Sequence, residues 1–205
     1  MKAWRRQSPS FVLVAALAFA GCGSAAPPAK EAAPCDVQHV AISVVTSPRL
    51  NPSREGEPRP VQLRIYQLKS DLRLANAEFD AVWNDDKATL GADLLKVSEV
   101  SVYPDERVEV QVERDNGAES LAGVALFRTP KGKSWQTTFA LPPAPGKEAC
   151  GAPCAGDDCK ARGQNPRFAF WLDETHIDDG ADHLGDHPPG RAVKPAPPPP
   201  EEKKP

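Results

Sequence analysis

Short runs of alternating apolar and polar residues recur along the chain, and this period of two is typical of half-buried β-strands. The strictest runs cover 61–68 and 108–113, and the second follows a turn at 104–106 that predicts a hairpin. We expect further strands over 37–46, 97–103, 121–127, 135–141 and 167–172. About seven short strands predict an all-β protein, an antiparallel β-sandwich of two sheets.

Residues 72–83 depart from the period of two. Their apolar side chains recur at spacings of three and four, which is typical of one stripe of a helix: Leu72, Ala75, Phe79, Val82 and Trp83. Asn76 is a candidate cap for the second half of this helix. We therefore expect a short helical insertion, with Phe79 and Trp83 packed in the core rather than against a ligand.

The first residues have the pattern of an export signal, with a basic start followed by an apolar run over 11–20. Ten helical residues span about 15 Å, which is too short for a bilayer core of about 30 Å. The run ends in 19–22 (FAGC), which resembles the lipobox of bacterial lipoproteins. That resemblance implies that residues 1–21 are removed and that Cys22 carries lipid. The alternative is an ordinary secretory peptide that leaves Cys22 as a free thiol.

The residues after Cys22 bear on where the anchored protein lies. Gly23 stands where, in enterobacterial lipoproteins, an Asp would retain the protein at the inner membrane, so the periplasmic face of the outer membrane is favoured. Residues 22–34 are small and include prolines, and they predict a flexible, lipidated tether.

The chain has five cysteines, and lipid on Cys22 leaves an even number in an oxidising compartment. The disulfide candidates are Cys35, Cys150, Cys154 and Cys159. Their pairing stays open, with Cys35 bonded to one of the later three as the favoured arrangement. A zinc site formed by the three late cysteines and His176 is the alternative, although the paired C-x2-C spacing of zinc ribbons is missing.

Composition sets the expected domain limits. The β-sandwich domain is expected to occupy 35–176, interrupted by a Cys-, Pro- and Gly-rich insertion loop at 143–166. Residues 177–205 are rich in proline and charge, so we expect a disordered tail with polyproline II character. Removal of residues 1–21, which hold three basic residues and no acid, leaves 22 basic and 28 acidic residues. The acidic excess disfavours nucleic acid as a partner.

The sequence predicts no enzyme and no cofactor. It contains no G-x-S-x-G, Walker, dinucleotide-binding or H-E-x-x-H motif. His183 and His187 lie near four aspartates, Asp178, Asp179, Asp182 and Asp186, in the expected tail. A solvated acidic segment is the favoured interpretation, and a lipoprotein that binds a small ligand or divalent metal is the alternative function.

Several segments, taken in their order along the chain, together resemble one family, the outer-membrane lipoprotein of the type VI secretion system called TssJ. They span about 85 residues behind the lipobox. The matching residues are Asn51-Pro52, Gly56, Pro60, the run 61–68 (VQLRIYQL), Phe79, Trp83, Asp86, 90–95 (LGADLL), Pro104, 124–128 (VALFR) and Trp135. Arg64 and Tyr66 fit the pattern but are not assigned to a partner.

The resemblance implies a transthyretin-like sandwich of two four-stranded sheets. It also implies docking to the periplasmic part of the inner-membrane protein TssM, which would fasten the secretion complex to the outer membrane. The loop between the first two strands is a principal contact in that family and corresponds here to 48–59. Its candidate contact residues are Arg49, Asn51, Pro52, Ser53, Arg54, Glu55, Gly56, Glu57 and Arg59. The arginines suit charge-assisted hydrogen bonds, whereas Asn51 and Gly56 suit a role in shaping the loop.

Overall fold

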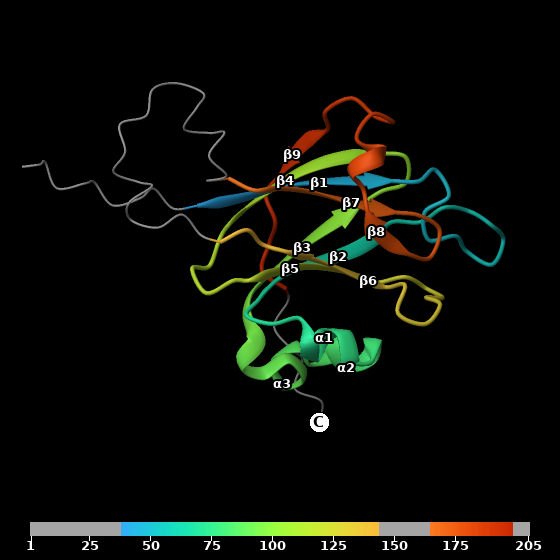
Figure 1. Cartoon of the computed structure of the whole chain (residues 1–205). Helices are drawn as coiled ribbons and strands as arrows, with labels where there is room; N and C mark the ends of the chain where they lie inside the picture. Colours follow the sequence, from blue (N-terminus) through green and yellow to red (C-terminus); the bar gives the residue numbers. More distant parts are fainter. Residues whose placement is uncertain (1–37, 144–164, 199–205) are drawn as a thin grey trace, which may run out of the picture. The chain divides into compact units, whose positions relative to one another are not determined.

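Two β-sheets pack face to face in the computed structural model, which describes residues 38–143 and 165–198 (Figure 1). The five-stranded sheet has the order β8 (Ile177–Asp179), β7 (Arg167–Leu172), β1 (His39–Thr46), β4 (Arg107–Glu113), β9 (Arg191–Val193). The four-stranded sheet has the order β3 (Leu94–Val102), β2 (Val61–Leu68), β5 (Ser120–Ala125), β6 (Gln136–Ala140). The predicted all-β sandwich is confirmed.

The period of two sets which side chains face the core between the sheets. Val61, Leu63 and Ile65 of β2 are at most 2% exposed, and the alternate valines of β4 are also buried. Gln67 continues the inward row of β2 and is 2% exposed. Its amide is satisfied, because Nε2 donates to the Glu113 carbonyl at 2.8 Å and Oε1 accepts from the Asp115 amide at 2.7 Å.

The five-stranded sheet differs from the expected antiparallel arrangement, because it contains two parallel pairs. Strand β1 runs parallel to β7, and β4 runs parallel to β9, while the other pairs of both sheets are antiparallel. Parallel neighbours need a long crossover connection. The chain supplies one, since β7 and β9 return to this sheet after the whole of the four-stranded sheet has been formed.

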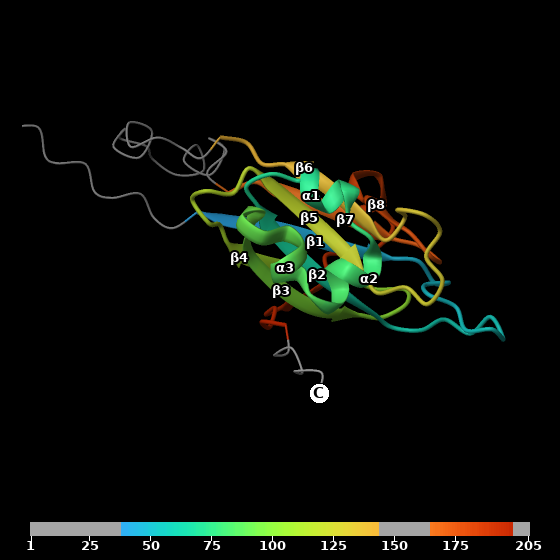
Figure 2. The same cartoon turned by 90° about the horizontal axis from the view of Figure 1, so that it is seen from below.

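The predicted helix over 72–83 is two short helices, α1 (Leu72–Asn76) and α2 (Phe79–Asn84). A third, α3 (Asp86–Leu90), and a 3-10 turn at Gly91–Asp93 follow. They cover the outer face of the four-stranded sheet (Figures 1 and 2). The helix breaks at Ala77, which is extended with φ −76° and ψ 156°. The proposed cap was wrong, because Asn76 donates back to the Leu72 carbonyl and Asp85 caps α3 instead.

The chain after Ile177 also differs from expectation, because 177–198 is ordered rather than disordered. Strand β8 pairs with β7, a 3-10 turn follows at Ala181–His183, and β9 extends the sheet beside β4. Ala196 then bridges to Glu99 of β3. These backbone hydrogen bonds hold a segment that has few apolar side chains. Gly190 permits the approach, because a Cβ there would lie 1.7 Å from the Arg107 carbonyl oxygen.

Several predicted features lie outside the described residues. These are the signal at 1–21, the tether at 22–34 with Cys22, residue Cys35, most of the insertion loop with its three cysteines, and the end of the tail at 199–205. They stay predictions from the sequence. Among the residues that the structure does describe, no helix is long and apolar enough to span a membrane.

Candidate functional site

Four connections of the sandwich meet at one end, which we call the loop end. They are 47–60 between β1 and β2, 103–106 between β3 and β4, 126–135 between β5 and β6, and 173–176 between β7 and β8. The strand register brings them together, since Val61 pairs with Val102, Leu63 with Ala125 and Thr46 with Leu172. The 47–60 connection extends beyond the ends of the strands (Figure 1).

The tip of the 47–60 loop closes on itself through Ser53. The Ser53 amide donates to the Glu57 carbonyl at 2.8 Å, and the Ser53 hydroxyl oxygen accepts from the amides of Glu55 and Glu57. Gly56 has φ +85°, a conformation that favours glycine, and its amide donates back to the Ser53 carbonyl. The exposed tip therefore has a defined backbone turn and can present its side chains in a fixed order.

Asn51 fixes the base of the same loop. It is 5% exposed with φ +48°, a left-handed conformation that asparagine tolerates. Its Nδ2 donates to the Pro60 carbonyl at 3.1 Å, and its Oδ1 accepts from the Arg128 amide at 2.9 Å. Its own amide donates to the Glu174 carbonyl. One side chain and its backbone thus join the loop to the 126–135 and 173–176 connections.

The three arginines of the loop have different surroundings. Arg49 pairs with Glu174 at 3.0 Å and Arg59 with Glu57 at 3.1 Å, and all four side chains are 43–75% exposed. Arg54 is exposed and has no ion pair or side-chain hydrogen bond with any residue in the described parts of the chain. Its guanidinium is free to take a carboxylate from outside.

Charge balance at the tip also involves Glu55, which is fully exposed. A hydrogen bond with Ser53 and one with its own backbone amide hold the pKa of Glu55 below its usual value, with smaller contributions from Arg59 and Arg128. Glu55 therefore stays ionised, and the tip presents both signs of charge.

Two functional candidates escape sequence reasoning. Tyr103 is 51% exposed, and its turn is held by the Thr46 hydroxyl, which donates to the Tyr103 carbonyl at 2.6 Å. Arg128 is exposed and, with Pro52, Ser53, Arg54 and Thr129, lines an open hollow of about 450 Å3. Arg128 closes the run 124–128, but only the fold shows that it stands beside the loop.

Arg64 and Tyr66, by contrast, lie on the covered outer face of β2, beneath the helices. The Arg64 guanidinium donates to Glu99 at 3.0 Å and to the Trp83 carbonyl at 2.8 Å, and it lies 4.1 Å from the Trp83 ring centroid. The Tyr66 hydroxyl donates to Asp86 at 3.2 Å. We call these five residues the helical flank cluster.

Burial acts on the pKa of both Tyr66 and Arg64, with different net results. Burial and the Asp86 carboxylate raise the pKa of Tyr66 far above its usual value, although the Arg64 guanidinium opposes them. Burial alone would lower the pKa of Arg64, but hydrogen bonds to Glu99 and Tyr66 outweigh it and raise that pKa. The Arg64 guanidinium therefore stays charged and the Tyr66 hydroxyl stays protonated, and their hydrogen bonds join β2 to Trp83 of α2 and Asp86 of α3.

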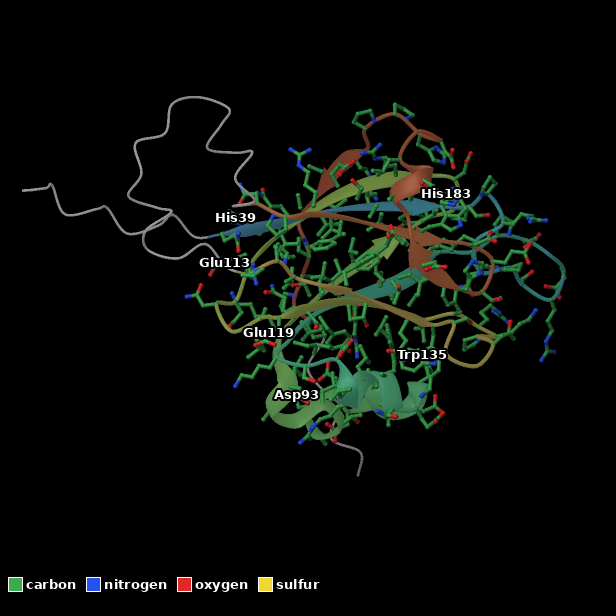
Figure 3. All side chains as sticks on the ribbon, viewed as in Figure 1. His39, Asp93, Glu113, Glu119, Trp135 and His183 are labelled. Atoms are coloured by element: carbon green, nitrogen blue, oxygen red, sulfur yellow. The ribbon has the colours of Figure 1, made fainter. Side chains whose placement is uncertain are left out.

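Phe79 and Trp83 pack against the core, as predicted. Both pack partly buried against the core, and the Phe79 ring lies 5.7 Å from the Trp83 ring and 5.4 Å from the Trp135 ring, measured between centroids. Trp135, labelled in Figure 3, is itself 2% exposed.

The histidines of the C-terminal segment are occupied by contacts within the chain. The His183 ring stacks on Trp171 at 3.8 Å between centroids, and its Nδ1 lies 2.8 Å from Asp186. His187 lies 3.8 Å from Asp105. Within 38–143 and 165–198 no three His, Cys, Asp or Glu side chains are grouped as metal ligands would be. In Figure 3 His183 lies on the other side of the sandwich from the helices.

Comparisons with solved structures agree with this architecture. TssJ1, the type VI secretion lipoprotein of Pseudomonas aeruginosa, is 24% identical, with 70% of this chain and 95% of that chain covered and a TM-score of 0.55. Lip of Serratia marcescens, a membrane-bound component of the type VI secretion system, is 17% identical, with 69% and 96% covered and a TM-score of 0.59. At these identities the likeness concerns the fold alone.

A third match is a chain from the structure of the C-terminal domain (869–1107) of the type VI protein TssM from EAEC. It is 18% identical, with 70% of this chain and 98% of that chain covered and a TM-score of 0.51. No curated protein sequence matches the chain significantly.

Family membership comes from the sequence. The family model for the type VI secretion lipoprotein, described by the names VasD, EvfM, TssJ and VC_A0113, matches residues 38–161, which is more than half of the chain. The chain therefore belongs to the TssJ family of type VI secretion lipoproteins.

Proposed function

We propose that this lipoprotein binds the periplasmic part of TssM through its 47–60 loop and so fastens the type VI membrane complex to the outer membrane. The observation that carries the proposal is the loop itself. It projects from the sandwich, its backbone is fixed by Ser53 and Asn51, and Arg54 is exposed without an acidic partner among the described residues. Fixed loops on a rigid sheet framework are a common place for binding residues.

The direction of β1 supports the same arrangement. His39, labelled in Figure 3, begins β1 at the end opposite the loop end, and Thr46 finishes it. Eight strand residues cover about 26 Å, so the loop lies that far from the point where β1 begins. A tether that enters at that point leaves the loop end free for a partner on the other side.

Replacement of residues 53–57 by Gly-Gly tests the loop assignment. The Ser53 amide and the Glu57 carbonyl lie 2.8 Å apart, so the segment can be excised with little change to its flanks. We expect loss of pull-down of the periplasmic part of TssM, with the midpoint of thermal unfolding nearly unchanged. Unchanged pull-down by the folded variant would defeat the assignment.

The anchor belongs to the same proposal and rests on the sequence. Lipid on Cys22 would hold the tether and domain at the periplasmic face of the outer membrane. Release of a Cys22→Ser variant into the soluble fraction is expected, and a variant that stays in the outer-membrane fraction would overturn this part.

A further inference from the structure

Arg128 is placed beside the loop by a side chain 77 residues away in sequence. The Arg128 amide donates to Oδ1 of Asn51 at 2.9 Å, so the first residue after the buried Phe127 is fixed against the base of the loop. Because this bond uses the backbone of Arg128, the guanidinium remains available. The contact joins two of the segments that resemble the TssJ family, 51–52 and 124–128.

Arg54 and Arg128 line the same hollow from two different connections, together with Pro52, Ser53 and Thr129. Neither guanidinium has an ion pair or a side-chain hydrogen bond with any residue within 38–143 or 165–198. Glu55 is the acid beside the hollow, and its pKa is lowered first by a hydrogen bond with Ser53 and, among smaller causes, by the charges of Arg59 and Arg128. The residues that line the hollow include two arginines and no acid, so one neighbouring carboxylate leaves the hollow with a net positive charge.

A hollow lined by two arginines suits a carboxylate. A guanidinium presents a planar set of N–H donors that matches the two oxygens of a carboxylate, and such charge-assisted bonds are stronger and more directional than neutral ones. The hollow is open, and its other walls are proline, serine and threonine. It has room for an acidic side chain carried on an extended protein segment.

We infer that this hollow receives an aspartate or glutamate side chain of the partner, with Arg128 as a second anchor beside Arg54. The inference rests on the proposed function, because it describes the chemistry by which the loop end recognises TssM. It assigns the partner's docking segment an acidic character and extends the docking surface from the 47–60 loop to the 126–135 connection.

The test is a calorimetric titration of the periplasmic part of TssM with the wild-type domain and with Arg128→Glu, Arg128→Lys and Arg167→Glu. We expect Arg128→Glu to weaken binding at least tenfold and Arg128→Lys to weaken it less, since lysine keeps the charge but not the planar fork. Arg167→Glu is the matched control, because Arg167 is exposed at the start of β7, at the opposite end of the sandwich. This variant should bind TssM with the wild-type affinity.

Two further measurements test the same contact: the salt dependence of the affinity, and charge reversal in TssM. Wild-type affinity should fall more steeply with salt than that of Arg128→Glu, because one screened pair is missing from the variant. Reversal of single acidic residues of TssM to arginine should restore binding to Arg128→Glu at one position. No rescue at any acidic position would contradict a carboxylate in the hollow.

The outcomes separate this inference from the proposed function. If the 53–57 replacement abolishes binding but Arg128→Glu binds as wild type, the carboxylate site is wrong and the loop assignment stands. If the replacement itself binds as wild type, the proposed function fails. Arg128→Glu should keep its thermal unfolding midpoint, since the bond to Asn51 involves only the Arg128 backbone.

Discussion

Arginines occur in two contrasting settings in this protein, both within segments that resemble the TssJ family. In the helical flank cluster, Arg64 is 8% exposed and is held by Glu99, the Trp83 carbonyl and the Trp83 ring. At the loop end, Arg54 and Arg128 are exposed and form no ion pair with any of the described residues. The same residue type serves the fold in one place and is available to a partner in the other.

A family pattern therefore does not by itself distinguish structural from docking residues. Removal of a guanidinium that is desolvated and paired within the chain costs much stability, because the acids left behind stay buried without a counter-ion. An exposed guanidinium contributes little to folding and can be changed with little loss of stability. Stability and binding measurements on matched variants should therefore separate the two regions.

The largest expected effect is on stability, from Arg64→Ala. The variant leaves Asp86 and Glu99 beneath the helices without their cation and removes the contact with Trp83. We expect the free energy of unfolding to fall by about 3–5 kcal/mol, measured by urea denaturation. Arg54→Ala is the matched control at the loop end and should change it by less than about 0.5 kcal/mol. Equal losses in the two variants would remove the distinction between the regions.

A smaller effect is expected from Tyr66, on the fall of the free energy of unfolding at alkaline pH. The pKa of Tyr66 is raised in the folded state, first by burial and then by Asp86, so the unfolded chain releases this proton near pH 10 while the folded chain keeps it. The contribution of Tyr66 to the free energy of unfolding is fully present below about pH 10. It is lost as the pH rises further, at up to about 1.4 kcal/mol per pH unit.

Tyr66→Phe should therefore flatten the fall of stability above pH 10. The chain has two tyrosines, and the exposed Tyr103 provides the control, since Tyr103→Phe should leave the pH dependence as in wild type. Urea denaturation at several pH values between 9 and 11.5 measures both variants. A fall of the same steepness in Tyr66→Phe and wild type would mean that Tyr66 does not set the alkaline limb.

Sequence periodicity predicts the strands of the sandwich well and the contacts between distant segments poorly. The strand runs 61–68 and 167–172 are found with the predicted bounds, because alternation reflects a buried face directly. The helix over 72–83 is wrong as a single element, since the apolar spacing of its stripe says nothing about the extended residue Ala77.

The ordered segment 177–198 and the position of Arg128 escape sequence reasoning for a related reason. Strand β9 is held by backbone bonds to β4, and Arg128 is placed by the Asn51 side chain. Both are long-range contacts in which one segment, 191–193 or the loop base at Asn51, has no hydrophobic pattern of its own. Asn51 itself was predicted as a shaping residue, but its partners, Pro60 and Arg128, become evident only in the fold.

Photo-crosslinking in cells tests directly whether the 47–60 loop docks TssM. A photoreactive residue at position 54, on the exposed loop, is compared with one at position 87, on the exposed surface of α3. The account predicts a covalent adduct with TssM from position 54 and none from position 87. Adducts with TssM from position 87 but not from position 54 would place the docking surface on the helical flank and contradict the account.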